Sequence, residues 1–392
     1  MMIPRILRKR LKQVSAQYPV LTLTGPRQSG KTTLVRDLFS TFTYLNLEDR
    51  DVLSFAKEDP KSFLRQTKKG MIIDEIQRAP HLSSYIQVLI DESKKKSVQF
   101  VLTGSQQFEV IEAVNQSLAG RTAIAKLLPF SMAELLYEKI IKPESDSIPS
   151  LIYTGFYPRI YHQKLNPTQA YSFYISTYVE RDLKNIRFVQ DLSQFQRFLK
   201  LCATRIGQLT NFSEFGNEIG VDHKTAQSWF SILEASYICF RLPPHFRNFR
   251  KRITKSSKLY FYDVGLASYL LGIESEKQLL SHPLQGTLFE NLVIADILKI
   301  RFHNLKENNA YFFRDHTGNE IDLILDYGEK LWPIEIKSGQ TIQDSFLKGL
   351  HYYLNLHPPL FKKPVLVYGG EQRQSRSTVE ICPLWDLNRL KI

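Results

Sequence analysis

One short run constrains the fold of this chain more than any other part of its sequence. Residues 25 to 32 read GPRQSGKT, which matches the pattern GxxxxGK[ST], follows the apolar stretch VLTLT and precedes a helix-compatible stretch. A strand, a glycine-rich loop and a helix N-terminus in this order form a phosphate-binding loop, in which backbone amides converge on the β-phosphate. The alternative is a glycine turn that matches the pattern by chance. We predict ATP binding by the following residues: Gly25, Pro26, Arg27, Gln28, Ser29, Gly30, Lys31, Thr32 and Thr33.

Two side chains of this loop and two acids downstream predict hydrolysis. Lys31 neutralises charge on the β- and γ-phosphates, and the Thr32 hydroxyl is a ligand for Mg²⁺. Residues 71 to 75 (MIIDE) read as a short apolar strand that ends in two carboxylates. We expect Asp74 to hold Mg²⁺ through water, and Glu75 to polarise the attacking water as a general base. The alternative for these acids is a pair of surface carboxylates at a strand end.

Two further segments carry candidate catalytic residues. The run VLTGS at residues 101 to 105 reads as an apolar strand that ends in hydroxyl residues. Thr103 is our choice for a side chain that senses the γ-phosphate from a strand between the other two motifs, although a helix cap or a turn also fits this run. Arg121 follows a helix-like segment, where it is a candidate arginine finger for the nucleotide of a neighbouring subunit. The alternative is a surface arginine.

Hydrophobic periodicity divides the 392 residues into segments. The first 130 residues alternate strand-like runs (VLTLT, TYLNL, MIID, FVLTG) with helix-like stretches, which predicts an α/β fold with a parallel sheet covered by helices. Helical patterns follow, and strands return after residue 259. We predict a P-loop ATPase core (1–130), a helical lid or connector (131–194), a winged-helix-like module (195–258) and a second α/β domain (259–392).

The balance of charge is strongly basic, with a net charge of +13 at pH 7. This balance favours polyanionic partners, and nucleic acid before acidic membranes. No stretch approaches the roughly 18 apolar residues that span a membrane, no secretion signal is found, and the three scattered cysteines argue against disulfides and zinc. We expect a cytoplasmic protein. The basic residues near the N-terminus are expected on a solvated helix face: Arg5, Arg8, Lys9, Arg10 and Lys12.

Several segments together resemble one family. GPRQSGKT, IIDEIQ, VLTGS and SLAGR are similar to the AAA-type ATPase domain of a large prokaryotic family whose C-terminal half is an uncharacterised, nuclease-like domain. The similarity continues through KTAQSWFSILEASYICFRLPP, NFRKRITKSSKLYFYDVGLASYLLG, EIDLIL and PIEIKSG, so it covers nearly the whole chain. The resemblance implies ATP binding and hydrolysis, and it defines no biological role.

A candidate nucleic-acid interface precedes the terminal domain. Predicted helices at residues 213–219 and 223–235 make a helix-turn-helix, and residues 241–258 carry seven Lys or Arg and no acid, which suits a wing that grips phosphates. The alternative is that the helices mediate domain packing or oligomerisation and that the charges form a solvated face. We predict contacts with nucleic acid, DNA in preference to RNA, by these residues: Lys224, Gln227, Arg247, Arg250, Lys251 and Arg252.

Near the C-terminus, two predicted strands carry Asp322 (EIDLIL) and the pair Glu335 and Lys337 (PIEIK), and a predicted helix near 285–300 carries Glu290. Glu335 and Lys337 are two residues apart and therefore face the same side of a strand. The set is similar to the core of PD-(D/E)xK nucleases, restriction-endonuclease-like α/β domains in which acids bind Mg²⁺ and a lysine activates water. We predict the three acids as metal ligands, and Asp322, Glu335 and Lys337 as catalytic. A salt-bridged sheet face, or a domain that binds without cleavage, is the alternative.

These features lead to two candidate functions. The preferred one is an Mg²⁺-dependent ATPase that acts on nucleic acid through a winged helix and a nuclease-like domain. The alternative is an ATP-dependent conformational switch or regulator, whose terminal domain binds DNA or a protein partner without cleavage. In either case Arg121 suggests a homo-oligomer.

Overall fold

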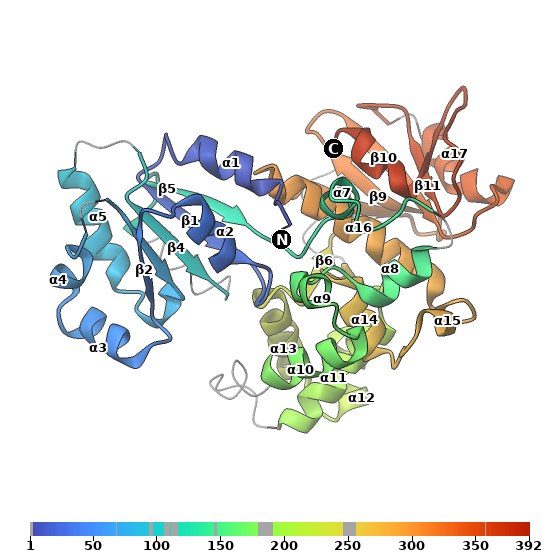
Figure 1. The fold of residues 1–392 in the computed structure, drawn as a ribbon. Coiled ribbons are helices and arrows are strands. Elements are labelled where there is room, and N and C mark those ends of the chain that lie inside the picture. Colours follow the sequence, from blue (N-terminus) through green and yellow to red (C-terminus); the bar gives the residue numbers. More distant parts are fainter. Residues whose placement is uncertain are drawn as a thin grey trace. The chain divides into compact units, whose positions relative to one another are not determined.

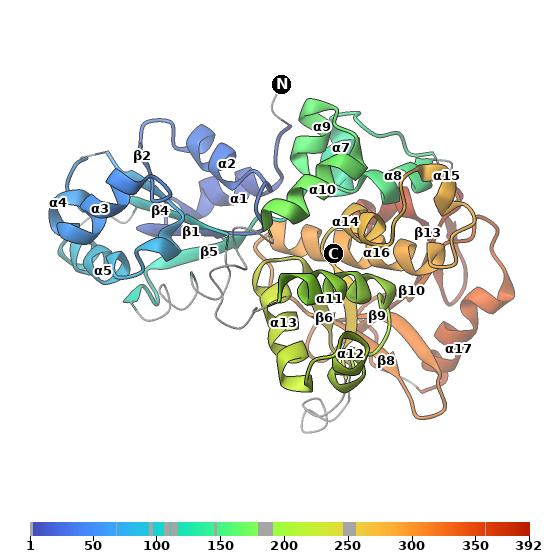
Figure 2. The ribbon, with the colours of Figure 1, turned by 90° about the horizontal axis from the view of Figure 1, so that it is seen from below.

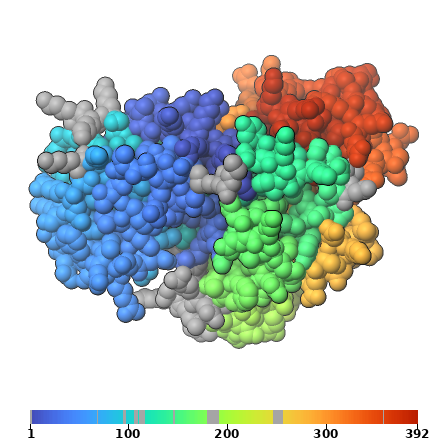
Figure 3. All heavy atoms as spheres, viewed as in Figure 1, coloured from blue at the N-terminus to red at the C-terminus, as the bar shows by residue number. Residues whose placement is uncertain are grey.

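The computed structural model describes residues 3–67, 69–93, 97–105, 110, 117–144, 147–178, 191–245, 256–356 and 358–392. The chain forms two compact units. The first comprises Met1–Phe130, Ala235–Tyr237 and Arg301–Glu307, and the second Ser131–Glu234, Ile238–Ile300 and Asn308–Ile392. In Figure 3 the atoms of the first unit are mainly blue and cyan, and those of the second run mainly from green to red. Within the described ranges, no helix is both long and apolar enough to cross a membrane.

Within the described residues, the first unit contains a five-stranded parallel sheet in the order β2-β3-β4-β1-β5 (Figure 1). The strands are β1 (Val20–Thr24), β2 (Thr43–Asn46), β3 (Met71–Asp74), β4 (Phe100–Gly104) and β5 (Thr122–Lys126). Every residue of β1, β3 and β4 is buried, as expected for a parallel sheet with both faces covered. The four strands predicted from apolar runs are confirmed, whereas β5 was not predicted because TAIAK has only one large apolar residue.

Helices cover both faces of this sheet, because successive strand residues point to opposite sides. Ile73 and Leu102 enter one core, which helices α3, α4 and α5 cover, and Ile72 and Val101 enter the other, which α1 and α2 cover. These helices are α1 (Leu7–Val14), α2 (Lys31–Leu38), α3 (Arg50–Glu58), α4 (Pro60–Leu64) and α5 (Leu82–Glu92). Each large apolar side chain buried here stabilises the fold by roughly 1.5–3 kcal/mol, so the two cores hold the strand ends in place.

The second unit begins with helices, as predicted for the stretch after residue 130. These are α7 (Met132–Tyr137), α8 (Ile148–Thr154), α9 (Pro158–Gln163), α10 (Pro167–Tyr178) and α11 (Leu192–Thr204). Helix α7 begins with a capping box, in which Ser131 and Glu134 satisfy each other's backbone amides. The helical nature of this segment is therefore confirmed over its described residues.

A helix-turn-helix follows at the predicted place, formed by α12 (Phe212–Ile219) and α13 (His223–Ala235). Helix α12 ends at Gly220, whose φ of 83° is readily adopted only without a side chain. Asp222 then caps α13 by accepting hydrogen bonds from two backbone amides of its first turn. Between the helices, the ring of Phe198 packs against the rings of Phe215 and Trp229. A tight turn and an aromatic core thus fix the angle between the two helices.

The rest of the second unit is built on a mixed six-stranded sheet in the order β12-β13-β11-β10-β9-β8, counted over the described residues. Strands β8, β9, β10 and β13 of this sheet are labelled in Figure 2. Its strands are β8 (Ala310–Arg314), β9 (Glu320–Asp326), β10 (Leu331–Lys337), β11 (Val365–Tyr368), β12 (Gln374–Ser375) and β13 (Glu380–Pro383). Strands β8, β9 and β10 pair antiparallel, and β10, β11 and β13 pair parallel. Helices of this part include α14 (Val264–Leu270), α15 (Glu276–Leu279), α16 (Gln285–His303) and α17 (Lys348–Asn355). The helix near 285–300 and the strands carrying EIDLIL and PIEIK are confirmed.

An antiparallel hairpin of β6 (Cys239–Leu242) and β7 (Lys258–Phe261) joins the helix-turn-helix to this sheet. Beyond β6, Pro244 forms a bridge to Phe312 of β8, and the backbone amide of His245 donates to the carbonyl of Phe312 at 2.6 Å. The predicted boundary between residues 258 and 259 therefore falls inside β7. The segments predicted as connector, winged helix and terminal domain contribute to one compact unit.

Candidate functional site

Three strands of the first unit end at the same edge of the sheet. Strand β1 leads into the phosphate-binding loop after Thr24, β3 ends at Asp74, and β4 ends at Gly104. Since the strands are parallel and β4 lies between β1 and β3, their carboxyl ends bring together the loop, the two acids and the hydroxyl residues. The predicted place of Thr103, on a strand between the other two motifs, is confirmed.

The loop has a backbone shape that its glycines permit. Gly25 has a φ of 148°, and a Cβ there would lie 2.1 Å from a backbone carbonyl oxygen after β5, while Gly30 has a φ of 92° where α2 begins. Lys31 is buried and donates from Nζ to the carbonyl oxygens of Gly25 and Pro26, both at 2.8 Å. The Ser29 hydroxyl oxygen is buried without a hydrogen-bond partner among the described residues. An orphaned hydroxyl and a lysine folded over a glycine cradle fit a bound phosphate.

Asp74 is the centre of the polar contacts at this edge, although only 5% of the residue is exposed. Its Oδ2 accepts hydrogen bonds from Thr32 Oγ1 and Tyr44 OH, each at 2.7 Å, and its Oδ1 accepts one from Thr103 Oγ1. Burial, and then the bond to Asp74, raises the pKa of Tyr44, so the phenol stays a donor. Mg²⁺ beside substrate phosphates takes few protein ligands, and a carboxylate next to a hydroxyl suits it. Thr32 and Asp74 therefore fit the predicted metal site.

Glu75 lies half-buried beside Asp74. Its backbone is left-handed, with a φ of 59°, a conformation that costs a residue with a side chain about 1 kcal/mol or more. Its Oε2 accepts hydrogen bonds from Gln77 Nε2 and, at 3.0 Å, from Ser105 Oγ. Two neighbouring side chains thus fix the orientation of this carboxylate, which a general base requires.

Arg121 lies at the amino-terminal ends of the strands, whereas the phosphate-binding loop lies at their carboxyl ends. Its carbonyl oxygen accepts a hydrogen bond from the amide of Val20, the first residue of β1, at 3.2 Å. The phosphate-binding loop follows the last residue of β1, roughly 16 Å away at about 3.3 Å per residue, which is farther than an arginine side chain extends. The guanidinium binds both carboxylate oxygens of Asp91, at 2.6 and 2.9 Å. Arg121 therefore does not reach the loop of its own chain.

Three contact residues of this edge were not predicted as site residues. Tyr44 on β2 and the pair Gln77 and Ser105 hold the two acids. Gln77 offers a recognisable signal, because it follows Glu75 by two residues within the motif IIDEIQ. Nothing in the sequence marks Tyr44 in this way, because its strand β2 comes to lie beside Asp74 only when β2 pairs with β3 in the sheet.

Arg5 corrects one expectation from the sequence. It was expected on a solvated helix face, but only 8% of it is exposed. Its guanidinium donates to the carbonyl oxygens of Ser29 at 2.7 Å and Leu128 at 2.6 Å, and lies over the ring of Phe130, 4.9 Å from the centroid. The residue therefore ties the phosphate-binding loop to the segment that follows β5, a role that needs contacts between distant parts of the chain.

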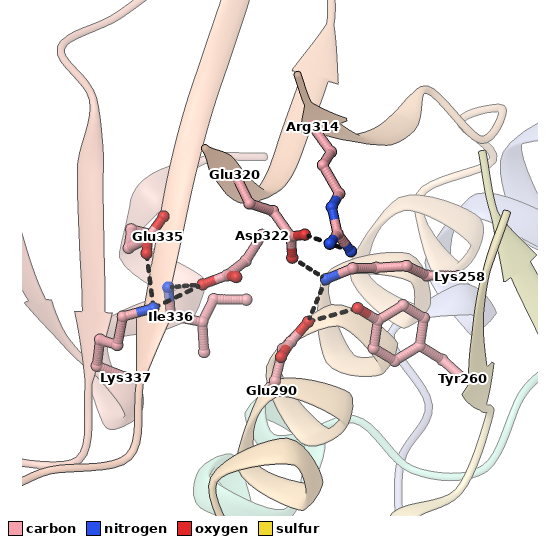
Figure 4. A network of polar contacts seen from close by, with 9 residues as sticks. All are labelled: Lys258, Tyr260, Glu290, Arg314, Glu320, Asp322, Glu335, Ile336 and Lys337. Carbon is pink, nitrogen blue, oxygen red and sulfur yellow. Dashed lines mark hydrogen bonds and ion pairs between the residues drawn. The ribbon is translucent and has the colours of Figure 1, made fainter. Parts of the chain in front are cut away.

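The second unit gathers the predicted acids and the lysine at one place (Figure 4). Because β9 and β10 pair antiparallel, Asp322 comes to lie near Glu335 and Lys337, as predicted for a hairpin. Lys337 Nζ lies 2.6 Å from Glu335 Oε1 and 3.3 Å from Asp322 Oδ2. The backbone amide of Ile336 also donates to Asp322 Oδ2, at 2.8 Å. Lys337 is therefore a bridge between the two acids.

Glu290 of α16 reaches the same place but is bound by residues that were not predicted. Lys258 Nζ lies 3.4 Å from Glu290 Oε1 and also pairs with Glu320 of β9. The hydroxyl of Tyr260 donates to Glu290 Oε1, and Arg314 NH1 lies 3.6 Å from Glu320 Oε2. Lys258 and Tyr260 alternate on β7 and so face the same side. The spacing of Lys258 and Tyr260 indicates that they share one face of a strand. Nothing in the sequence indicates that Glu290 and Glu320 are their partners.

Burial and crowding shift the protonation of this cluster. Burial, aided by the charge of Asp322, raises the pKa of Glu335 to about 8 and that of Glu290 to about 7. Burial alone would lower the pKa of Lys258 and Lys337, but the surrounding carboxylates hold both above the usual value. Both lysines therefore remain charged. Oε2 of Glu335 is buried without a hydrogen-bond partner in the described part of the chain.

This geometry does not fit the prediction that Glu290, Asp322 and Glu335 are metal ligands. Across the described ranges, no group of three or more His, Cys, Asp and Glu side chains is placed so that it could hold a metal ion. Lys337 lies between Asp322 and Glu335, as the pattern predicts, whereas the cation beside Glu290 is Lys258, which the pattern does not include. The arrangement agrees with a salt-bridged sheet face.

Two of the predicted nucleic-acid residues lie on α13. Lys224 and Gln227 are exposed, whereas Ala226 and Phe230 of the same helix are buried. The predicted apolar and polar faces of the helix are therefore both observed. The other four predicted residues lie outside the described residues: Arg247, Arg250, Lys251 and Arg252.

A phosphate-binding loop after β1, an acid pair after β3 and a polar strand end between them, on a parallel α/β sheet, define a P-loop nucleoside triphosphatase domain. Comparison with protein families specifies its type: residues 17–136 match a family model described as an AAA domain. Residues 145–277 and 285–387 match two models, each described as a domain of unknown function (DUF8612 and DUF4143). The resemblance to AAA-type ATPases with a C-terminal domain of unknown function is thus confirmed. These matches support ATP binding and hydrolysis, and they define no activity for the second unit.

Two relatives resemble most of the chain. Uncharacterized proteins of Mycobacterium tuberculosis and Mycobacterium bovis are each 28% identical over 335 residues, which is 85% of this chain and 73% of theirs. Among solved structures, a Walker-type ATPase of Pyrococcus abyssi is similar at 12% identity and a TM-score of 0.45, over 67% of this chain and 94% of that chain. A RuvB variant of Thermotoga maritima is similar at 17% identity and a TM-score of 0.34, over 60% of this chain and 87% of that chain.

Proposed function

We propose that this protein is an Mg²⁺-dependent ATPase that acts on nucleic acid. The match to an AAA domain supports ATP binding and hydrolysis. The observation that carries the metal-dependent part is the contact of Thr32 with Asp74, beside a Glu75 that is held by its neighbours. Thr32 and Asp74 would hold Mg²⁺, which supplies neutralisation of phosphate charge when it is bound.

The remaining side chains at this edge have separate tasks in the proposal. Lys31 exchanges its bonds to the loop carbonyls for bonds to the phosphates of ATP, and Glu75 accepts the proton of the attacking water. Thr103 senses the γ-phosphate while it stays in contact with Asp74. Because Thr103 and Thr32 bind the same carboxylate, a change at the phosphate is passed to the strand β4.

The second unit supports nucleic acid as the partner. Helices α11, α12 and α13 followed by the hairpin β6–β7 have the order of a winged helix, and Leu209 between α11 and α12 bridges Lys258 as a short extra strand would. The net charge of +13 favours a polyanion. We infer that α13 approaches DNA with Lys224 near a phosphate and Gln227 near a base edge.

Replacing Lys224 by Ala is expected to weaken DNA binding for all sequences and to reduce the slope of log K against log salt by about one, because one phosphate contact is lost. Gln227→Ala should instead relax sequence preference. Fluorescence anisotropy of labelled duplexes over a salt series measures both effects. The matched control is Lys200→Ala, an exposed lysine on the neighbouring helix α11. Equal loss in Lys224→Ala and Lys200→Ala, or binding that ignores salt, argues against this interface.

The terminal sheet in this proposal binds DNA or protein without cleavage. Metal-assisted cleavage needs Mg²⁺ held by carboxylates of the protein, and lysines contact the carboxylates concerned. This supports one element of the alternative function that the sequence left open, a terminal domain that binds without cleavage, within the proposed ATPase that acts on nucleic acid. ATP hydrolysis in the first unit then serves to change the state of the second.

Arg121 supports a homo-oligomer with shared nucleotide sites. We expect Arg121→Ala to lower ATP turnover while it spares ATP binding, because only the contact with the neighbouring nucleotide is lost. Subunits of Arg121→Ala and of Lys31→Ala should recover turnover when mixed, since each supplies what the other lacks. Asp91→Ala is the control, because it breaks the ion pair of Arg121 but keeps the arginine. Absence of recovery on mixing would show that Arg121 is only a surface residue.

A further inference from the structure

Lys258 is buried far more deeply than lysines usually are, with 3% of the residue exposed. Its strand β7 belongs to the hairpin after the helix-turn-helix, yet its ammonium reaches Glu290 on α16 and Glu320 on β9 (Figure 4). The ring of Phe312 on β8 lies 5.5 Å from the ammonium. One side chain thus connects the hairpin, a helix and the terminal sheet.

Charge explains why these groups stay together. Burying an ion costs several kcal/mol unless it is paired and hydrogen-bonded, so Lys258 needs Glu290 and Glu320. Glu290 and Glu320 in turn need Lys258, because both acids lie near a third carboxylate, Asp322, and a nearby cation offsets the repulsion among them. Tyr260, on the same side of β7, donates to Glu290 and fixes its carboxylate. The charges here are therefore balanced by side chains of the chain itself.

The oxygen atoms that these cations occupy are those that a metal ion would require. Glu290 Oε1 contacts Lys258 and Tyr260, while Asp322 Oδ2 and Glu335 Oε1 both contact Lys337. Mg²⁺ binds carboxylate oxygens at about 2.0–2.1 Å, so it would have to displace these groups. Lys337 is partly exposed and belongs to the predicted nuclease pattern, whereas Lys258 is buried and does not.

We propose that Lys258 is a resident cation that takes the place of a divalent metal ion at Glu290, and that it fastens the β6–β7 hairpin to the terminal sheet. This inference rests on the proposed function, in which the terminal domain does not cleave DNA, and it names Lys258 as the residue that keeps a metal ion from Glu290. Removing the ammonium while keeping the acids leaves buried carboxylates without their cation. A divalent ion then binds in its stead.

The test is a titration of the nucleotide-free, full-length protein with Mn²⁺, followed by electron paramagnetic resonance. The wild-type protein and Asp322→Ala are expected to bind the same amount of Mn²⁺, because the wild-type protein holds no Mn²⁺ at the carboxylate cluster. Lys258→Met should bind Mn²⁺ at least about tenfold more tightly, and Mn²⁺ should raise its unfolding temperature because it binds only the folded state. Adding Glu290→Ala to Lys258→Met should abolish both effects, because the proposed ion binds at Glu290. The matched control is Lys299→Met, which removes another buried lysine, on α16, and gains no ion.

Each other outcome overturns part of the proposal. Mn²⁺ bound by the wild-type protein and lost in Asp322→Ala overturns the role of Lys258, and Mn²⁺-dependent cleavage of DNA in the same protein overturns the absence of cleavage as well. If neither the wild-type protein nor Lys258→Met binds Mn²⁺, only the role of Lys258 is overturned. Should Lys258→Met not fold, Lys258→Gln replaces it, because the amide still donates to Glu290.

Discussion

Replacing Lys31 by alanine is expected to lower ATP hydrolysis by about 100-fold to 1000-fold, the usual effect of removing one preorganised charge from a reacting group. Lys31 Nζ is already held over the loop by the carbonyl oxygens of Gly25 and Pro26. The ammonium therefore stands next to the place where phosphate charge develops, and alanine leaves that charge without it. ATP binding should weaken as well, since the lysine also pairs with the bound phosphates.

Phosphate release and equilibrium titration with a fluorescent ATP analogue measure these two effects. Lys57→Ala is the matched control, because Lys57 is an exposed lysine on α3 of the same unit. Circular dichroism should show that both variants keep the fold. Undiminished turnover in Lys31→Ala would refute the assignment of the loop as the nucleotide site.

Glu75→Gln is expected to separate binding from hydrolysis. Glutamine keeps the size of the side chain and can still accept the hydrogen bond of Ser105, but it does not take a proton from water. Hydrolysis should fall by about 100-fold to 10,000-fold, the range of general-base catalysis, while ATP affinity stays near that of the wild-type protein. Single-turnover phosphate release with bound ATP measures the chemical step directly.

The control for Glu75 is Glu92→Gln, an exposed glutamate near the end of α5. A comparison with Lys31→Ala sharpens the result, because Lys31→Ala loses affinity and Glu75→Gln does not. A Glu75→Gln protein that turns over ATP at the wild-type rate would mean that another group activates water. A loss of ATP affinity equal to that of Lys31→Ala would mean that Glu75 holds the loop in shape instead.

Most of the local structure could be predicted because it depends on neighbours in sequence. Gly25 and Gly30 have the positive φ angles that a phosphate-binding loop needs, and Gly220 ends α12 where the helical pattern is broken. The strands with long apolar runs were also predicted correctly. Strand β5 was missed because TAIAK has only one large apolar residue, and its place in the sheet comes from its pairing with β1.

The carboxyl ends of the strands in the first unit show which residues cannot be predicted from neighbours in sequence. Thr32, Asp74 and Glu75 were recognised because their motifs have fixed spacing. Arg5 was assigned to a solvated face, since nothing in a run of basic residues distinguishes the one that folds beneath the loop. Tyr44 was missed because it meets Asp74 only once β2 and β3 pair in the sheet.

The cluster of Glu290, Asp322, Glu335 and Lys337 also depends on contacts between distant segments that the sequence does not reveal. Spacing and pairing of two strands correctly brought Asp322, Glu335 and Lys337 together. What the pattern did not include is Lys258, which enters from strand β7, more than thirty residues before Glu290 in the sequence, and contacts Glu290 and Glu320. A pattern of acids does not reveal which cation balances them.

The sequence by itself determined the chemistry of the first unit, because a phosphate-binding loop and an acid-ended strand need particular residues at particular spacings along the backbone. Only the tertiary structure decided which charges meet across elements. It holds Arg121 at the far edge from its own loop, buries Arg5 beneath that loop, and brings Lys258 to Glu290. The physical reason is that burial of a charge depends on partners from distant segments, and local spacing carries no record of them.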